Sequence, residues 1–310
     1  MAVVPVVADR AESAGGTAPK RRRRSSGASG PSVRPTMSVA ATALLALGSI
    51  YTLLPVLWVL IASTKSSASL FTTSTAVPGG SLLANVKQLN AYRSGLFWRW
   101  MANTALYAGG GALLGTLVCG LAGFALAKYR FRGSKLFFNV MLGGVMVPAV
   151  VLAVPTYLML AKLNLAGGYL SVLLPSAAAG LPYGTYLGRI FAASSVPDEI
   201  LEAARIDGAG EWRLMLRIAA PMMAPGLASM FLFQFVGIWN NFLLPYIMLG
   251  DDRKFPLTVG LYSLLNQGTY QPAVYNLVIT GALLSILPLI VLFLTLQRYW
   301  RSGIVTGAVK

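Results

Sequence analysis

The sequence of 310 residues has no histidine, one cysteine and few charged residues. The lack of histidine excludes histidine-based metal sites, catalytic triads and proton relays. The single cysteine, Cys119, cannot form a disulfide within the chain, and its apolar surroundings favour a packing role. Charged residues make up 11% of the chain, whereas a soluble domain carries about 25%. The chain has too few charges to cover a water-facing surface, and we interpret it as a membrane protein.

The nine acidic residues all lie outside the long apolar stretches of the sequence. Proton-driven carriers usually place an ionisable group at membrane depth, so this absence weighs against a self-sufficient secondary carrier. Sodium coupling through backbone carbonyls keeps that class open. The phosphate-binding pattern G-x-x-x-x-G-K-[ST] is also absent. The energy for active transport would therefore have to come from a partner.

Hydrophobic residues make up 56% of the chain, and six stretches reach the length of about 20 residues that a membrane-spanning helix needs. None of these stretches contains a charged residue. We therefore predict an all-α membrane protein with six transmembrane helices. Prolines within the stretches, including Pro148 and Pro182, remove backbone donors and predict kinks, which would serve either helix packing or the hinges of a pore. The predicted spans are Val39–Ala62, Thr104–Ala127, Leu136–Leu160, Tyr169–Gly188, Met222–Leu249 and Ala273–Leu296.

Residues 1–36 are rich in Ala, Gly, Ser, Pro and Arg, so we predict a disordered, Arg-rich cytoplasmic tail before a six-span domain at residues 37–310. With the tail in the cytoplasm, 18 of the 25 Lys and Arg residues fall on the cytoplasmic side, as the positive-inside rule requires. We therefore predict a multi-pass protein with both termini in the cytoplasm. The run Lys20–Arg24 could instead bind nucleic acid, but a topology signal explains it more simply, and we expect no nucleic-acid partner.

Five of the nine acidic residues lie between the fourth and fifth predicted spans, in residues 192–221, which we call the acidic loop. Ser195 and the acids that follow it are typical of a helix start, and Gly208 is typical of a helix end. We predict one helix at about Val196–Asp207 and a second at about Glu211–Ala219.

The first of these helices is predicted to be amphipathic, because two kinds of residue repeat at helical spacing. One face consists of Val196, Ile200, Ala203, Ala204 and Asp207, and another of Glu199, Glu202 and Arg205. The two small alanines permit close approach by another surface. The residues alone leave two interpretations open, a docking helix for a partner or a solvated hairpin that lies on lipid headgroups.

The acidic loop resembles the EAA loop of ABC importer permeases. That pattern reads E-A-A-x-x-x-G, then nine variable residues, then I-x-L-P. Glu202-Ala203-Ala204, Gly208, Ile218 and Pro221 match it, and Ala220 stands where the family prefers leucine. The motif is long and specific, so it favours the docking interpretation.

Two further segments carry the same resemblance. Trp239-Asn240-Asn241-Phe242 with Pro245 is similar to the W-N-x-F-x-x-P signature of sugar-type permeases. The end of the chain, with Gln297-Arg298-Tyr299 and a final Gly-Ala-Val-Lys, resembles the terminus of the second permease in maltose-type and glycerol-phosphate-type importers. The similarity covers roughly residues 37–310.

The resemblance implies the type I ABC importer permease (MetI-like) architecture, in a bacterial inner membrane and without enzymatic activity of its own. It implies a heterodimer with a second permease subunit, a cytoplasmic ATPase dimer and an extracytoplasmic solute-binding protein. ATP and Mg would bind to the ATPase, and no cofactor would bind to this chain. The solute would be a sugar or an oligosaccharide. A glycerol-phosphate ester as the solute, or a secondary carrier instead of an importer, remain as alternatives.

In that family the EAA loop is the coupling helix that docks in a cleft of the ATPase. The residues implied for coupling are Glu202, Ala203, Ala204, Asp207, Gly208, Ile218 and Pro221. The candidates for contact with solute or pore are Gln234, Trp239, Asn240, Asn241 and Tyr246. Their amides and rings suit sugar hydroxyls and sugar faces, but polar residues in spans also join helices to one another. The terminal residues Gly303, Thr306, Gly307 and Lys310 either reach the ATPase or form a frayed end.

Overall fold

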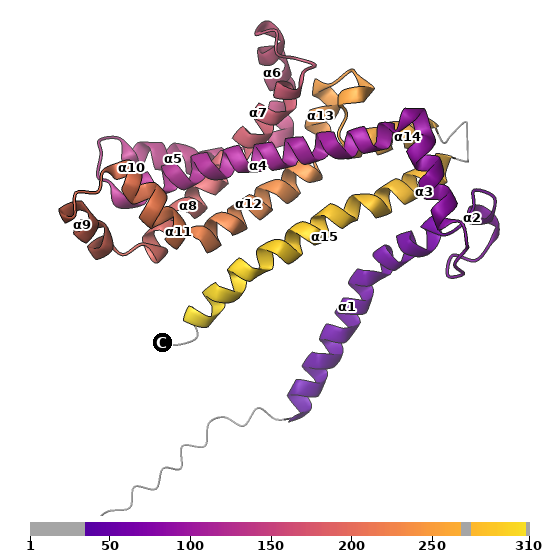
Figure 1. The fold of residues 1–310 in the computed structure, drawn as a ribbon, viewed down its shortest axis with the longest axis horizontal. Helices are drawn as coiled ribbons and strands as arrows, with labels where there is room; N and C mark the ends of the chain where they lie inside the picture. The colour runs from indigo at the N-terminus through magenta and orange to yellow at the C-terminus, as the bar shows by residue number, and fades with distance from the viewer. Residues whose placement is uncertain (1–34, 268–273, 308–310) are drawn as a thin grey trace, which may run out of the picture. The chain divides into compact units, whose positions relative to one another are not determined.

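The computed structural model describes residues 35–267 and 274–307, and every regular element in these ranges is helical (Figure 1). The elements are α1 (Pro35–Ser63), α2 (Ser69–Thr72), α3 (Leu82–Ala91), η1 (Tyr92–Ser94), α4 (Leu96–Lys128), α5 (Ser134–Gly144), α6 (Ala149–Lys162), α7 (Tyr169–Ala179), α8 (Leu181–Ser195), α9 (Asp198–Ile206), α10 (Glu211–Arg213), η2 (Leu214–Ala219), α11 (Ala220–Met222), α12 (Ala224–Trp239), α13 (Leu243–Met248), η3 (Asp252–Lys254), α14 (Leu257–Gln267) and α15 (Val274–Gly307).

The chain divides into two compact units, residues 1–52 and residues 53–310. The described part of the first unit is the beginning of α1, and residues 1–34 of the predicted tail lie outside the described residues. Helix α1 then continues to Ser63 and contains Pro55. Its apolar portion, Val39–Ser63, is long enough to cross a membrane. The predicted span Val39–Ala62 is therefore confirmed as a helix.

Helix α4 is the central helix of the second unit. Its buried residues recur every three to four positions along its whole length, from Leu96 to Phe124, which is the spacing of one helix face. Helices α7, α8 and α12 pack along this face (Figure 1). Small residues such as Gly115 and Gly123 belong to it and allow the neighbouring helices to approach closely.

Two other predicted spans are also confirmed as parts of long helices. The apolar helices Leu96–Lys128 and Val274–Tyr299 are both long enough to cross a membrane. The first begins eight residues before the predicted Thr104, because Phe97 and Trp100 are buried and continue the packed face of α4. The second lies in α15, which extends well beyond the predicted end at Leu296.

The predicted span Leu136–Leu160 consists of two helices, and the interruption predicted at Pro148 is confirmed. Helices α5 and α6 are separated by a short break and cross at 104°. Pro148 stands directly before α6 with an extended backbone (φ −63°, ψ 124°), and proline also disfavours the helical conformation in the residue before it. Only the two helices taken together are long and apolar enough to form a span.

The prediction of one continuous helix at Met222–Leu249 is wrong. Helix α12 ends at Trp239, and α13 begins only at Leu243. The amide of Asn240 donates to the Val236 carbonyl at 2.9 Å, and the Asn241 side chain accepts from the backbone nitrogen of Leu244 at 3.3 Å. Asparagine side chains compete in this way with the backbone hydrogen bonds of a helix.

The predicted span Tyr169–Gly188 corresponds to two helices, α7 and α8, which meet at Gly180. Pro182 occupies the first turn of α8, where its missing backbone donor has no helical partner to lose. Helix α8 continues seven residues past Gly188, to Ser195. Both helices pack against α4, so the interruption leaves the bundle intact.

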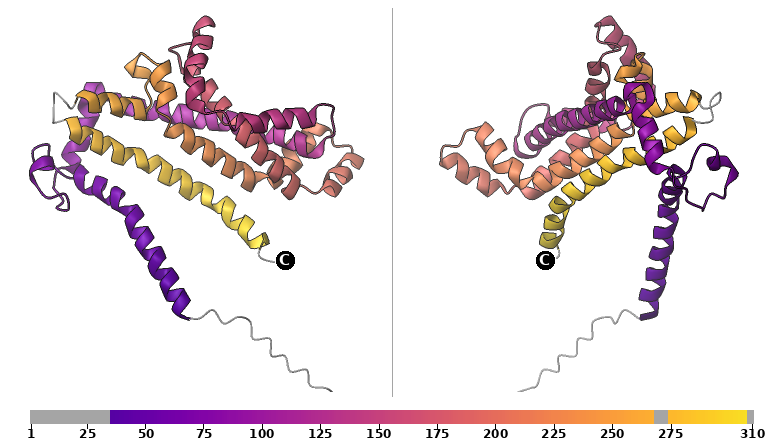
Figure 2. Two further views of the ribbon diagram at one scale, coloured as in Figure 1. Left: turned by 180° about the vertical axis from the view of Figure 1, so that it is seen from behind. Right: turned by 45° about the vertical axis from the view of Figure 1, so that its right-hand side comes forward.

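Helices α6 and α7 project from the bundle at a distance from the hairpin of α9 and α10 (Figure 2). At the C-terminal end of α4, Lys128 forms an ion pair with Asp198 at the start of α9. At its N-terminal end, the indole nitrogen of Trp100 donates to the Asp252 carbonyl at 2.8 Å. Lys254 reaches the Gly167 carbonyl at 3.0 Å, so the loop between α6 and α7 lies at this second end as well. Two of the segments predicted to be cytoplasmic, after α4 and between α8 and α12, therefore lie at the C-terminal end of α4, and two loops predicted to be external lie on the side of its first turns.

Candidate functional site

The acidic loop forms a helical hairpin. Its first helix, α9, begins at Asp198, two residues later than predicted, because α8 continues through Ser195 and Pro197 is extended (φ −64°, ψ 141°). Ser195 therefore ends one helix instead of capping the next. The second predicted helix, Glu211–Ala219, is confirmed as helical, and its larger part is the π-helical segment η2.

Apolar packing holds α9 on the rest of the chain. Leu201 is 2% exposed, and it lies in a buried cluster with Val196 and Leu214. Of the face predicted to allow close approach by another surface, Ile200 is 41% exposed and Ala203 is also exposed, whereas Ala204 is half-buried. Leu201, three residues before Ala204, is the residue that buries this side of α9, and the sequence prediction did not include it.

A set of polar contacts joins the hairpin to the end of α4. The Nε atom of Arg205 lies 3.1 Å from Glu211, and the Tyr129 hydroxyl donates to the same carboxylate. Lys128 pairs with Asp198 at 2.7 Å. Hydrogen bonds from Arg205 and Tyr129 hold the pKa of the Glu211 carboxyl below its ordinary value, while burial and the bond to Glu211 raise the pKa of the Tyr129 phenol. Sequence reasoning missed Tyr129 and Glu211, because they are 82 positions apart.

The turn after α9 depends on Gly208, as the sequence predicted. Its φ of 79° lies in the left-handed region, where a side chain would be strained. The backbone nitrogen of Gly208 donates to the Arg205 carbonyl, and that of Ala209 donates to the Ala204 carbonyl at 2.9 Å. These bonds close the end of α9 and turn the chain toward α10.

The outward side of the hairpin displays most of the residues implied for coupling. Exposed are Glu202, Ala203, Asp207, Gly208 and Pro221, whereas Ala204 and Ile218 are half-buried against the chain itself. Two large apolar side chains lie beside the exposed acids, Ile206 at 87% and Trp212 at 71% exposure. The hairpin therefore presents a mixed acidic and apolar surface on a well-packed base, which is suited to binding a protein partner.

A cavity of about 310 Å³ lies between α7, α8 and α12. Its polar lining includes Ser176, Tyr183, Gln234 and Asn241, and the remaining lining residues are apolar or glycine. Both amide atoms of Gln234 and the hydroxyl of Ser176 are buried without a hydrogen-bond partner in the described structure. Unpaired buried polar groups are costly, and the Gln234 amide is packed against Gly115 and Gly180. Tyr183 is exposed and Asn241 half-buried, so these two side chains offer hydrogen bonds to an uncharged, polar molecule in the cavity.

The five residues predicted to contact solute or pore do not form one site. Gln234 and Asn241 line the cavity. Trp239 is 4% exposed and stacks on Phe235 at 5.4 Å, so it belongs to the core. Asn240 and Tyr246 are exposed outside the cavity, and the Tyr246 ring stacks on Phe242.

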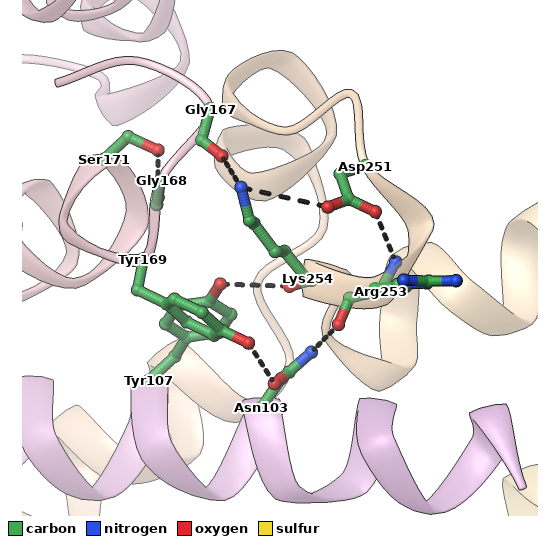
Figure 3. Close-up of polar contacts among 9 residues, drawn as sticks. All are labelled: Asn103, Tyr107, Gly167, Gly168, Tyr169, Ser171, Asp251, Arg253 and Lys254. Atoms are coloured by element: carbon green, nitrogen blue, oxygen red, sulfur yellow. Dashed lines mark hydrogen bonds and ion pairs between the residues drawn. The ribbon is translucent and has the colours of Figure 1, made fainter. Parts of the chain in front are cut away.

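The opposite end of α4 carries a second polar network (Figure 3). The amide of Asn103 donates to the carbonyls of Arg253 at 2.9 Å and Phe255 at 3.0 Å. The hydroxyl of Tyr169 donates to the Asn103 side chain at 3.3 Å, and that of Tyr107 donates to the Lys254 carbonyl at 3.0 Å. These bonds fix the loop before α14 on α4 and α7, so this end of the bundle is rigidly shaped.

The predicted terminal contact segment is described only in its backbone. Gly303, Thr306 and Gly307 lie in the last turns of α15, and Lys310 lies outside the described residues. In the described part of the chain, no group of three or more Asp, Glu, Cys or His side chains is arranged to hold a metal ion.

Comparison with known proteins assigns these features to a family of transport proteins. Residues 119–305 match the family described as binding-protein-dependent transport system inner membrane component. The arabinooligosaccharides transport system permease protein AraQ of Halalkalibacterium halodurans is 35% identical over 217 residues, which cover 70% of this chain and 76% of that protein. The sn-glycerol-3-phosphate transport system permease protein UgpE of Shigella flexneri is 30% identical, with 88% of this chain and 97% of that protein covered.

A sugar-related relative and a solved structure extend the similarity over most of the chain. The diacetylchitobiose uptake system permease protein NgcG of Streptomyces coelicolor is 28% identical, with 86% of this chain and 87% of that protein covered. One chain of a bacterial ABC transporter that imports the acidic polysaccharide alginate superimposes with a TM-score of 0.73 at 23% identity, covering 85% of this chain and 96% of that chain. The latter likeness confirms the predicted all-α permease fold.

Proposed function

Because this chain belongs to the family of binding-protein-dependent transport system inner membrane components, we infer that it is a pore subunit of an ABC importer that carries a sugar or oligosaccharide across the inner membrane. The chain is a permease subunit without a catalytic site of its own, and ATP is hydrolysed by a separate ATPase. Its partners would be a second six-span permease, an ATPase dimer and an extracytoplasmic solute-binding protein.

The acidic loop supports the coupling role of this chain. Glu202 and Ala203 are exposed on the hairpin. The hairpin is held on the end of α4 by the buried side chain of Leu201 and by the contacts of Glu211 with Arg205 and Tyr129. A force applied to the hairpin by an ATPase would therefore reach α4, which packs against three other helices of the bundle. Glu202 would pair with a basic group of the ATPase.

The sorting of the connecting segments supports the proposed orientation. The acidic loop and the basic segment after α4 share one end of the bundle, and the loops around Gly167 and Lys254 share the other. The positive-inside rule assigns the first end to the cytoplasm. Both termini would then be cytoplasmic.

The cavity beside Gln234 is the observation that favours a neutral, hydroxyl-rich solute. Amide and hydroxyl groups line it, and no charged side chain is among its described lining residues. The Shigella flexneri relative is named for a phosphate ester, so a glycerol-phosphate ester is the second candidate solute. A phosphate would be expected to meet arginine or lysine, and the lining of this cavity offers neither.

Affinity purification of the tagged chain in mild detergent tests the assignment. We expect a second six-span permease and a Walker-motif ATPase to co-purify, and the solute-binding protein encoded with them to bind a neutral saccharide. A chain that purifies alone and moves solute into liposomes without ATP would contradict the proposal.

A further inference from the structure

A second, smaller pocket of about 160 Å³ lies near the end of α4 that carries the acidic loop. It is formed by residues of α4, α5 and α8. It is separate from the cavity beside Gln234, because the two share no lining residue. The lining consists of Leu126, Ser134, Lys135, Phe138, Asn139 and Arg189. Two cations, one hydroxyl and one amide thus converge in a pocket whose described lining contains no acid.

Neither Lys135 nor Arg189 has an acidic partner among the residues that the structure describes. The four ion pairs of the described residues involve other side chains, and the nearby Lys128 is already paired with Asp198. The guanidinium of Arg189 instead lies 4.2 Å from the centre of the Phe138 ring. This cation–π contact orients the guanidinium without neutralising its charge, so the donors of Arg189 and Lys135 remain available to an anion.

The backbone under Arg189 is held tightly in place. Gly123 of α4 and Gly188 of α8 approach so closely that a Cβ atom added to Gly123 would lie 2.3 Å from the carbonyl carbon of Gly188. The Phe138 ring also stacks on Tyr186 at 6.3 Å. The spacing of the cationic groups is therefore set by helix packing and not by the loop between α4 and α5.

Exposed apolar side chains border the pocket on α5. Leu136 is 69% exposed, Phe137 43% and Val140 58%, and each is next in sequence to a lining residue. In a protein that resides in a membrane, such side chains face hydrocarbon. A ligand that fills the pocket with its anionic group would therefore have apolar surface directly beside it.

We propose that this pocket binds the headgroup phosphate of an anionic phospholipid of the cytoplasmic leaflet. Basic pockets between membrane helices on the cytoplasmic side are suited to such headgroups, and the exposed apolar side chains of α5 accommodate the acyl chains. The guanidinium of Arg189 supplies a paired donor for phosphate oxygens, and Lys135 adds a second charge. The inference depends on the proposed orientation but not on the importer function.

Native mass spectrometry of the full chain, purified in a zwitterionic detergent, tests this site. The probes are phosphatidylglycerol, phosphatidylcholine and inorganic phosphate. The variant Lys135→Gln with Arg189→Gln removes the two pocket charges, and the matched control Arg130→Gln with Arg132→Gln removes two charges from the neighbouring loop, outside the lining. Removal of two charges that contact a headgroup should weaken phosphatidylglycerol binding roughly 10- to 30-fold, while the control should retain most of it.

Three results would overturn the proposal. Equal losses in the two variants would show diffuse attraction by the basic segment without a defined site. Equal binding of phosphatidylglycerol and phosphatidylcholine would show that the headgroup charge is not recognised. Displacement of phosphatidylglycerol by millimolar inorganic phosphate would assign the pocket to a soluble anion. If the double variant does not fold, the variant Arg189→Lys tests the site instead. It keeps the positive charge but loses the planar guanidinium that binds two phosphate oxygens. We expect it to lose phosphatidylglycerol binding to an intermediate degree.

Discussion

The Nε atom of Arg205 lies 3.1 Å from the carboxylate of Glu211, and the hydroxyl of Tyr129 donates to the same carboxylate. These contacts connect three elements, because Arg205 belongs to α9, Glu211 to α10, and Tyr129 follows the last residue of α4. The carboxylate of Glu211 therefore joins the hairpin to the central helix of the bundle. In the proposed importer this junction passes motion of the ATPase to α4.

We expect Glu211→Gln to lower coupling more than it lowers stability. The change removes the charge that binds Arg205, but apolar packing around Leu201 still holds α9 in place. The ion pair is exposed, and exposed pairs contribute only about 0–1 kcal/mol. The measurement compares solute moved per ATP hydrolysed in the variant and in the unchanged complex. A normal ratio would contradict the role assigned to Glu211.

Acidification should loosen the contact of the hairpin with Tyr129 without detaching α9, which apolar packing still holds. The pKa of Glu211 is lower in the folded protein than in the unfolded chain, where it is about 4.3. The contact therefore contributes its full stabilisation above that value and loses it as the pH falls through the lower, folded pKa. Hydrogen exchange at backbone amides of residues 198–213 should rise in this acidic range and not between pH 6 and 8. In Glu211→Gln the acid-dependent rise should be absent, and its persistence would count against this assignment.

Gly123 should tolerate no side chain. A Cβ atom there would lie 2.3 Å from the Gly188 carbonyl carbon and 2.5 Å from the Arg189 nitrogen. Because the clash is with backbone, Gly123→Ala should cost about 1–3 kcal/mol or more. Gly109→Ala is the matched control in the same helix, because a Cβ atom added there meets no atom within 4 Å. Thermal unfolding in detergent should separate the two variants, and equal melting temperatures would contradict the close approach of α4 and α8.

Lys65 organises the segment that follows α1. The residue is 2% exposed, and its ammonium donates to the Ser74 carbonyl at 2.6 Å and to the Thr73 hydroxyl at 3.0 Å. Lys65→Met would remove hydrogen bonds from a charged donor, each of which contributes about 1.5–3 kcal/mol. The exposed Lys87→Met serves as control. We expect faster protease cleavage within residues 66–80 only in Lys65→Met, and identical cleavage of both variants would show that this ammonium does not hold the segment.

Gln234→Leu should change solute affinity without loss of stability. Neither amide atom of Gln234 has a nitrogen or oxygen hydrogen-bond partner in the described structure, so an apolar replacement sacrifices only a weak contact with the Cys119 thiol. Loss of one hydrogen bond to the solute would raise the apparent KM for uptake by about 2- to 10-fold. Asn240→Leu, at an exposed position outside the cavity lining, should leave KM unchanged. If both variants keep the original KM, the cavity does not contact the solute.

The sequence was sufficient for elements whose signal is local. Length and apolar composition predicted the helices at residues 39–62 and 104–127, since a long uncharged run in a membrane forms an uninterrupted helix. The positions of the acidic hairpin and of the turn at Gly208 were also predictable, because acids in a first helical turn and a glycine at a helix end act over a few residues.

The sequence alone did not predict features that depend on competing local interactions or on contacts between residues far apart in the chain. The sequence predicted a kink at Pro148 but not the 104° bend between α5 and α6, and it did not predict the break after α12, which results from side-chain bonds of Asn240 and Asn241. Hydropathy does not register either effect. The junction of Tyr129 and Glu211 brings together residues 82 positions apart, and the burial of Trp239 depends on its stacking with Phe235. Such contacts follow from packing and not from spacing.

ATP-dependent uptake in proteoliposomes tests the central claim most directly. The purified complex, with its binding protein and solute, is compared with complexes that carry Glu202→Lys or Glu199→Lys, the latter the same charge change on an exposed residue of α9 outside the matched motif. Loss of a charge pair at a docking interface costs about 2–5 kcal/mol, so Glu202→Lys should abolish uptake while Glu199→Lys retains most of it. Uptake that proceeds without ATP, or that is unaffected by Glu202→Lys, would contradict the account.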